Sequence, residues 1–161
     1  MTVSHDIMQS PITNAWDEEL ARVKLEAESA FLFTPEHDDD WHYSHHPFLT
    51  RFAGAYYAMW SSGWRHEDDV GQRVMLATSR DFRHWSEPRV LVPTARGQYS
   101  DMVRYAEGWH RHDGALVAYY AQYEYEPDAL VDGHRTKEDR RHMNTRLFAI
   151  TWTSRYRESI P

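Results

Sequence analysis

Two patterns of hydrophobic and polar positions divide the chain near residue 41. Before it, apolar side chains recur at steps of three and four residues from Trp16 to Phe31, the spacing of one helix face. Acidic residues open this segment and Thr13 or Asn14 can cap it, as at a helix N-terminus. We therefore predict a polar segment followed by a helix over residues 15–30, both within residues 1–40.

From Trp41 onward, short runs of β-branched and aromatic residues alternate with glycine, proline and aspartate, a texture typical of antiparallel strands joined by tight turns. Ala53-Gly54 and Asp113-Gly114 are hairpin signals. We therefore expect an all-β body, with strands at Phe48–Phe52, Tyr56–Ser61, Arg73–Thr78, Arg89–Val92, Met102–Ala106, Leu116–Tyr123 and Arg146–Thr151.

These strands form two copies of one unit. Residues 52–60 match residues 112–120 at an offset of 60, and residues 73–78 match residues 146–151 at an offset of 73, so the second copy is 13 residues longer between its second and third strands. A repeat of about 60 residues with four antiparallel strands is typical of a propeller blade. We predict a partial β-propeller, with blade one at residues 41–95 and an incomplete blade two at residues 96–161.

Closed propellers have about four to eight blades. We therefore expect a part of a longer propeller, or a chain that self-associates through its open blade edges.

Composition and net charge limit the classes of partner and binding site that we expect. The 161 residues carry a formal net charge of −7 and include no cysteine. We therefore expect no basic nucleic-acid-binding surface, no disulfide and no thiolate metal site. No apolar run has the length of a membrane span and no secretory signal is visible, which favours a cytoplasmic protein without a membrane partner.

Residues 79–88, with the sequence SRDFRHWSEP, resemble a turn of glycoside-hydrolase propellers, a shorter relative of the sialidase Asp-box. In that turn the Asp, here Asp81, accepts backbone N–H groups and the Trp, here Trp85, packs between sheets. Over residues 41–153 the chain resembles an exo-alpha-sialidase-like member of the sialidase superfamily. The resemblance implies a parent of five or six blades that hydrolyses terminal glycosides in its full-length form.

The resemblance also directs attention to His46-Pro47. In arabinanase-like propellers an Asp-Pro pair opens the innermost strand and its Asp is the general base, so His46 stands at that position. Adjacent residues on a strand point to opposite faces, so at most one of His45 and His46 is expected to line a pocket. Ligand contact, metal ligation and structural hydrogen bonding are the alternatives for this pair.

Blade topology places the remaining candidates. The loop before strand one and the loop between strands two and three share one rim, and the Asp81 turn lies on the opposite rim. Sugar sites combine aromatic rings, planar polar groups and two carboxyl groups. We predict Asp69, Asp101 and His46 as catalytic residues. The predicted substrate-binding residues are His45, Gln72, Arg73, Tyr123, Glu124, His142, Asn144 and Arg146.

Several alternatives stay open for these residues. Asp69 belongs to a charge run that is also typical of a solvated loop. Tyr123 and Glu124 resemble the sialidase Tyr–Glu nucleophile, and they also fit a blade edge. Gln72 directly precedes Arg73, Asn144 lies two residues before Arg146, and each arginine can bind a carboxylate or brace a loop. The leading function is sialidase-like glycoside hydrolysis, and the alternatives are a non-catalytic carbohydrate-binding propeller or an inactive structural fragment. We expect no metal and no cofactor.

Overall fold

The computed structural model describes residues 29, 31–35, 41–131, 134–135 and 142–153. The chain divides into two units, residues 1–30 and residues 31–161, and the sheets below all lie in the second. The helix predicted at residues 15–30 lies outside the described residues except for Ser29, so it stays a prediction. Within the described residues, no helix has the length and apolar character needed to cross a membrane.

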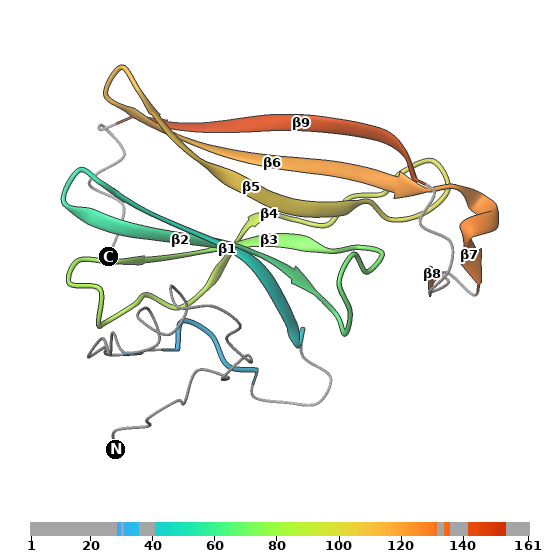
Figure 1. Ribbon diagram of the computed structural model, residues 1–161, viewed down its shortest axis with the longest axis horizontal. Helices are drawn as coiled ribbons and strands as arrows, with labels where there is room; N and C mark the ends of the chain where they lie inside the picture. The colour runs from blue at the N-terminus through green and yellow to red at the C-terminus, as the bar shows by residue number, and fades with distance from the viewer. Residues whose placement is uncertain (1–28, 30, 36–40, 132–133, 136–141, 154–161) are drawn as a thin grey trace, which may run out of the picture. The chain divides into compact units, whose positions relative to one another are not determined.

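The first sheet is a four-stranded antiparallel meander in chain order (Figure 1). Its strands are β1 (Tyr43–Phe52), β2 (Ala55–Gly63), β3 (Arg73–Ser79) and β4 (Arg89–Val92). β2 and β3 are buried along most of their length on both faces, which explains their nearly continuous apolar sequence.

The second sheet has three antiparallel strands in the order β5-β6-β9, namely β5 (Val103–His112), β6 (Ala115–Tyr125) and β9 (His142–Thr153). Between β6 and β9 lie the 3₁₀ turn η1 (Pro127–Ala129) and a small hairpin of β7 (Leu130–Val131) and β8 (His134–Arg135). This insertion occupies the place of the additional residues in the second repeat. The all-β, antiparallel fold is thus confirmed; β4 has the predicted bounds, and the other predicted strands are longer than expected.

The two sheets repeat one register. Leu49 pairs with Ala58 in the first sheet and Trp109 with Ala118 in the second, each shifted by 60 residues. Both hairpins turn through two residues of positive φ, Ala53-Gly54 (49° and 84°) and Asp113-Gly114 (48° and 73°), as a type I′ turn requires. The repeat read from the sequence is therefore a repeat of backbone geometry.

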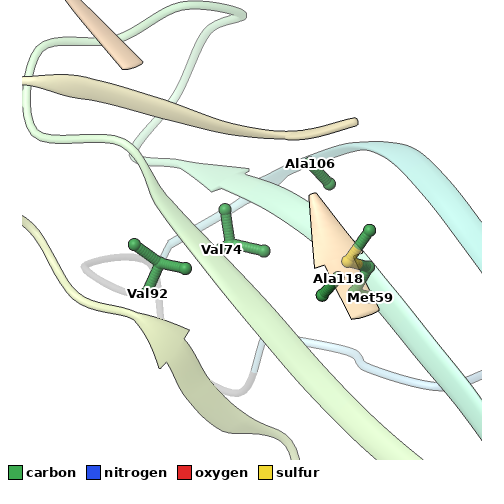
Figure 2. Packing of buried hydrophobic residues seen from close by; sticks show 5 residues of the cluster. All are labelled: Met59, Val74, Val92, Ala106 and Ala118. Carbon is green, nitrogen blue, oxygen red and sulfur yellow. The ribbon is translucent and has the colours of Figure 1, made fainter. Parts of the chain in front are cut away.

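A shared core joins the sheets. Met59, Val74 and Val92 of the first sheet pack with Ala106 and Ala118 of the second (Figure 2). Polar contacts reinforce this packing: Ser61 Oγ accepts the buried N–H of Ala106 at 2.9 Å, and Trp109 Nε1 donates to the carbonyl of Phe48 at 3.1 Å. The opposite face of β2 and β3 carries a second cluster of Trp60, Met75 and Ala77, against which Phe33 and Trp85 pack.

The turn that resembles an Asp-box is built as expected. One carboxylate oxygen of Asp81 accepts the N–H groups of Arg83 and His84 at 2.9 and 2.8 Å, and the other lies 2.6 Å from the His84 ring. The hydrogen bonds from His84 and Arg83 hold the pKa of Asp81 well below its usual range. Since Ser79 pairs with Tyr56 beside the β1–β2 turn, Asp81 lies at the end of the sheet away from His45.

Candidate functional site

The loop between β2 and β3 is folded by its own polar groups. Asp69 Oδ2 accepts the N–H groups of Arg65 at 2.6 Å and His66 at 2.8 Å, and the Asp69 carbonyl accepts the N–H of Gln72 at 3.0 Å. The side chain thus bonds backward to N–H groups three and four residues earlier, a local contact by which aspartate stabilises non-helical backbone. Asp69, predicted as catalytic, therefore has a carboxylate that holds the loop in shape.

Gln72 lies at the end of this loop with its side chain fully buried. Its Oε1 accepts the N–H of Asp68 at 3.2 Å, and its Nε2 donates to the carbonyl of Arg104 at 3.0 Å. These two backbone partners fix the orientation of the amide, because a carbonyl can only accept and an N–H can only donate. His45 Nε2 lies 2.9 Å from the same Oε1, so Gln72 anchors His45 to the loop.

The expectation that His45 and His46 diverge is wrong. Their rings lie side by side, with centroids 4.2 Å apart. The cause is a β-bulge: β1 pairs with β2 at His45 and again at Phe48, with His46 and Pro47 between, and His46 adopts a φ of 50°. A bulge breaks the alternation of side chains and re-aims one of them.

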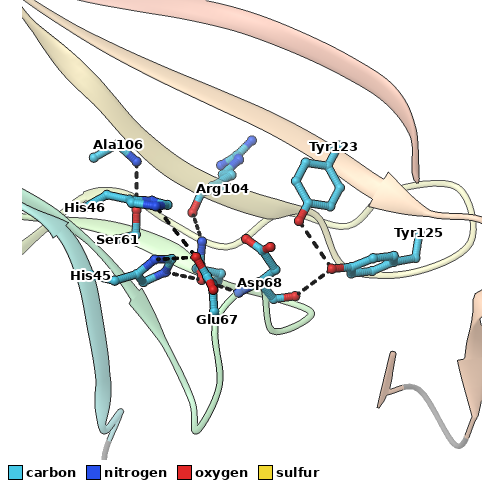
Figure 3. A network of polar contacts seen from close by, with 10 residues as sticks. His45, His46, Ser61, Glu67, Asp68, Arg104, Ala106, Tyr123 and Tyr125 are labelled. Atoms are coloured by element: carbon cyan, nitrogen blue, oxygen red, sulfur yellow. Dashed lines mark hydrogen bonds and ion pairs between the residues drawn. The ribbon is translucent and has the colours of Figure 1, made fainter. Parts of the chain in front are cut away.

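Glu67 reaches both imidazoles (Figure 3). Its Oε1 lies 3.8 Å from His45 Nδ1 and 3.7 Å from His46 Nε2. The side chains of Glu67 and His46 are about half exposed, whereas that of His45 is only 11% exposed. In the described part of the chain, these three form the one group of histidine and acidic side chains whose potential ligand atoms all lie within 4.8 Å of one another.

Tyrosine rings border this group. Tyr43 packs edge-on against His45, and Tyr105 lies 6.4 Å from His46 between ring centroids. Burial raises the pKa of Tyr105, assisted by the charges of Glu107 and Asp68. Partly buried phenol rings therefore form one side of the site.

Tyr123 joins the same rim through Tyr125. The two hydroxyls lie 3.3 Å apart, and the Tyr125 hydroxyl donates to the carbonyl of Asp68 at 3.1 Å (Figure 3). Burial, the hydrogen bond with Tyr125 and the nearby charge of Asp68 raise the pKa of Tyr123 far above its usual range. This hydroxyl is therefore held neutral, which is unfavourable for a nucleophile.

Glu124 turns to a different set of partners. Its carboxylate accepts the N–H of Tyr99 at 3.0 Å and the side-chain amide of Asn144 at 2.7 Å. Burial acts to raise the pKa of Glu124, but these hydrogen bonds and those from the N–H groups of Ser100 and Gln98 outweigh it and lower the pKa. Glu124 and Asn144, both predicted as substrate-binding, tie the loop segment before β5 to β6 and β9.

The remaining predicted residues are dispersed. Asp101 pairs with Arg96 at 3.4 Å and lies beside Gly71. Arg73 stacks on the Trp41 ring at 4.1 Å, and its position opposite Ser62 puts it on the other face of the sheet from Gln72. Burial lowers its pKa. Arg146 is exposed on β9 opposite Gln122, and His142 begins β9 opposite Tyr125.

Two residues of the site were not among the predicted catalytic or substrate-binding residues. Glu67 belongs with Asp69 to a charge run that fits either a solvated loop or a sugar-binding carboxylate, and sequence alone named no partner for it. Tyr105 had a signal, because it is 60 residues beyond His45 and pairs with Ala121 as His45 pairs with Ser61. Adding the repeat offset of 60 to the position of His45 identifies Tyr105.

The repeated antiparallel sheets and type I′ hairpins define the class of protein, a β-propeller built from blade-like units. A family model described as BT_1020-like, N-terminal beta propeller matches residues 29–123. Since the match spans more than half of the chain, the chain belongs to this family. No curated protein and no solved structure matches it significantly. The propeller is thus confirmed, and membership of the sialidase superfamily is not.

Proposed function

We propose that the rim formed by the start of β1, the β2–β3 loop and the start of β5 binds carbohydrate. The observation that carries this proposal is the placement of His46, which lies beside both the Glu67 carboxylate and the ring of Tyr105, with His46 and Glu67 partly exposed. Sugar sites pair polar groups that accept or donate to hydroxyls with aromatic rings that cover the apolar face of the sugar.

Further aromatic side chains on this rim support the proposal. Trp64 and Tyr99 are 46% and 43% exposed, and both belong to segments at this end of the sheets. Trp64 accepts the N–H of His42 through its carbonyl, and Tyr99 donates its N–H to Glu124, so both backbones are fixed. Rings that are exposed and yet held in place lose little entropy on binding a ligand.

The geometry favours recognition over hydrolysis. Glycoside hydrolysis needs two carboxyl groups facing the scissile bond. The carboxylates of Asp69 and Glu124 are engaged with backbone N–H groups, and Asp101 faces Arg96. The sialidase-like Tyr–Glu couple is also separated, because Tyr123 contacts Tyr125 while Glu124 contacts Asn144. A test of hydrolysis should therefore examine Glu67, whose carboxylate is partly exposed at the rim.

The test is a binding titration of the full chain against neutral, uronic-acid and sialic-acid oligosaccharides, run beside an aryl-glycoside assay. We expect saturable binding that Trp64→Ala and Glu67→Gln each weaken by about tenfold or more. Leu147→Ala removes an exposed apolar side chain on β9 and serves as the matched control. Binding that survives both rim substitutions would refute the proposal, and turnover abolished by Glu67→Gln would replace it with a hydrolase.

A further inference from the structure

We propose that His45, His46 and Glu67 form a binding site for a divalent transition-metal ion, with Zn²⁺ as the best match. This inference does not depend on carbohydrate binding, because metal binding is measured without a sugar. It rests on the convergence of the three ligand atoms, on the hydrogen bond that orients His45, and on the local backbone.

The ligand atoms lie close to coordination distances. Zinc binds imidazole nitrogen and carboxylate oxygen at about 2.0–2.2 Å, so two ligands of a tetrahedral site are separated by roughly 3.4 Å. Glu67 Oε1 is 3.8 Å from His45 Nδ1 and 3.7 Å from His46 Nε2. The three ligand atoms all lie within 4.8 Å of one another, and the partly exposed Glu67 and His46 side chains can rotate to bring them to coordination distance.

A direct ion pair accounts for these distances less well. Charge-assisted hydrogen bonds between nitrogen and carboxylate are about 2.7–2.9 Å long, and both separations here are nearly 1 Å longer. His45 Nδ1 is moreover buried and makes no hydrogen bond within the described residues. A buried nitrogen of this kind costs free energy unless something else engages it, and a metal ion accepting its lone pair does so.

The lone pair of His45 Nδ1 is set by a chain of hydrogen bonds. The N–H of Asp68 and the carbonyl of Arg104 fix the Gln72 amide, whose Oε1 then accepts from His45 Nε2. A neutral imidazole that donates through Nε2 presents a lone pair at Nδ1. Metal-bound histidines almost always donate their second ring N–H to such an acceptor, so Gln72 is a positioning residue for this ligand.

The backbone is shaped to bring the two imidazoles together. His46 holds a φ of 50° directly before Pro47, in a left-handed conformation that non-glycine residues adopt rarely and at a cost. The second sheet also has an extra residue at this place, between Ala106 and Gly108, with Ala106 where the first has His46 and Tyr105 where it has His45. There the positive φ falls on Gly108 (139°), so the extra residue is a property of the repeat, whereas the left-handed backbone at position 46 and the ligand set occur in the first copy.

The ligand chemistry selects the metal. Two imidazoles and one carboxylate match the three protein ligands of zinc sites that keep a fourth position open. Imidazole-rich sets also suit copper and nickel, whereas calcium and magnesium prefer all-oxygen sites. Glu67 and His46 lie partly exposed, so the open position faces the rim.

The experiment is calorimetric titration of the untagged, EDTA-treated full chain with ZnCl₂, with MgCl₂ as the second probe. We expect one Zn²⁺ per chain, and at least tenfold weaker binding in His46→Asn and in Glu67→Gln. Asparagine tolerates the left-handed backbone at position 46. His112→Asn is the matched control, because His112 Nε2 lies 3.1 Å from the Asp113 carboxylate in an exposed imidazole–carboxylate pair.

A second measurement uses only the wild-type chain, so it stays informative if a variant does not fold. The imidazole ¹⁵N spectrum of the wild-type chain should show His45 protonated at Nε2 without metal and a shift of its Nδ1 signal with Zn²⁺. Absence of Zn²⁺ binding, equal affinity in wild type, His46→Asn and Glu67→Gln, or a loss confined to His112→Asn would each overturn the proposal.

Discussion

Replacing Glu124 with glutamine should destabilise the protein markedly, because its carboxylate is used as an acceptor on both oxygens. Glu124 is 1% exposed, and it accepts from Tyr99 N at 3.0 Å and from Asn144 Nδ2 at 2.7 Å. Gly97 makes room for it: a Cβ there would lie less than 3 Å from Glu124 Oε2. The loop segment before β5 is therefore folded tightly around one buried charge.

The magnitude follows from the two acceptors. A hydrogen bond to a charged group contributes about 1.5–3 kcal/mol. Glutamine keeps one oxygen and places an NH₂ where the second oxygen was, so a donor faces either Tyr99 N–H or the Asn144 amide. One charged bond is lost and the other becomes neutral. We expect the free energy of unfolding to fall by about 2–4 kcal/mol, a large part of a typical 5–15 kcal/mol.

Urea denaturation followed by tryptophan fluorescence measures this change, with Glu87→Gln as an exposed control that should stay within about 0.5 kcal/mol of wild type. The difference should also depend on pH. A carboxyl whose pKa is lowered by folding stabilises the protein above its unfolded pKa, and this contribution disappears as the pH falls through the folded pKa. The Glu124→Gln difference should therefore shrink below about pH 4. A difference below 0.5 kcal/mol at pH 7, or one that is independent of pH, would refute the reasoning.

Two further substitutions test the framework. Ser61→Ala removes the acceptor of the buried Ala106 N–H, so the free energy of unfolding should fall by about 1–3 kcal/mol in urea denaturation, whereas the exposed Ser44→Ala should change little. Asp81→Asn should lower the melting temperature at neutral pH, by an amount that diminishes as the pH falls because folding lowers the pKa of Asp81. Its zinc and glycan titrations should match wild type, since Asp81 lies at the opposite end of the sheet, and a loss of binding would contradict the assignment of the rims.

The fold was predictable because its information is local and repeated. Alternating apolar runs and the turns at Gly54 and Gly114 specify hairpins, and the offsets of 60 and 73 align the strands of the two sheets from the sequence alone. The registers reproduce those offsets, since Ala58 pairs with Ala77 and Ala118 with Ile150. The β7–β8 hairpin was missed because its strands are two residues long, too short for a periodic signal.

The site was less predictable because it depends on departures from regular strands. Alternation along β1 placed His45 and His46 on opposite faces, and the bulge at His46-Pro47 reversed that outcome. The extra residue of a bulge is not marked by a particular residue type, so the hydrophobic pattern of β1 does not reveal it. Long-range hydrogen bonds, such as the one from Gln72 to the Arg104 carbonyl, are equally invisible in a single sequence.

A comparison of Gln72 with Asn144 shows that the repeat preserves backbone conformation and does not preserve the chemical role of a residue. Gln72 directly precedes Arg73, and Asn144 lies two residues before Arg146, so the two amides are not at equivalent positions of the repeat. The offset of 73 that aligns the strands instead matches Asn144 with Gly71, and both have positive φ, 58° and 84°. The repeat therefore preserves a left-handed backbone position where the loop joins the third strand, and glycine or asparagine satisfies it. In the second copy that position supplies an amide that fixes Glu124, whereas in the first it is a glycine beside Asp101, and the next residue, Gln72, turns inward to orient His45. The same backbone conformation thus supports a structural hydrogen bond to Glu124 in the second sheet and the candidate binding residues in the first.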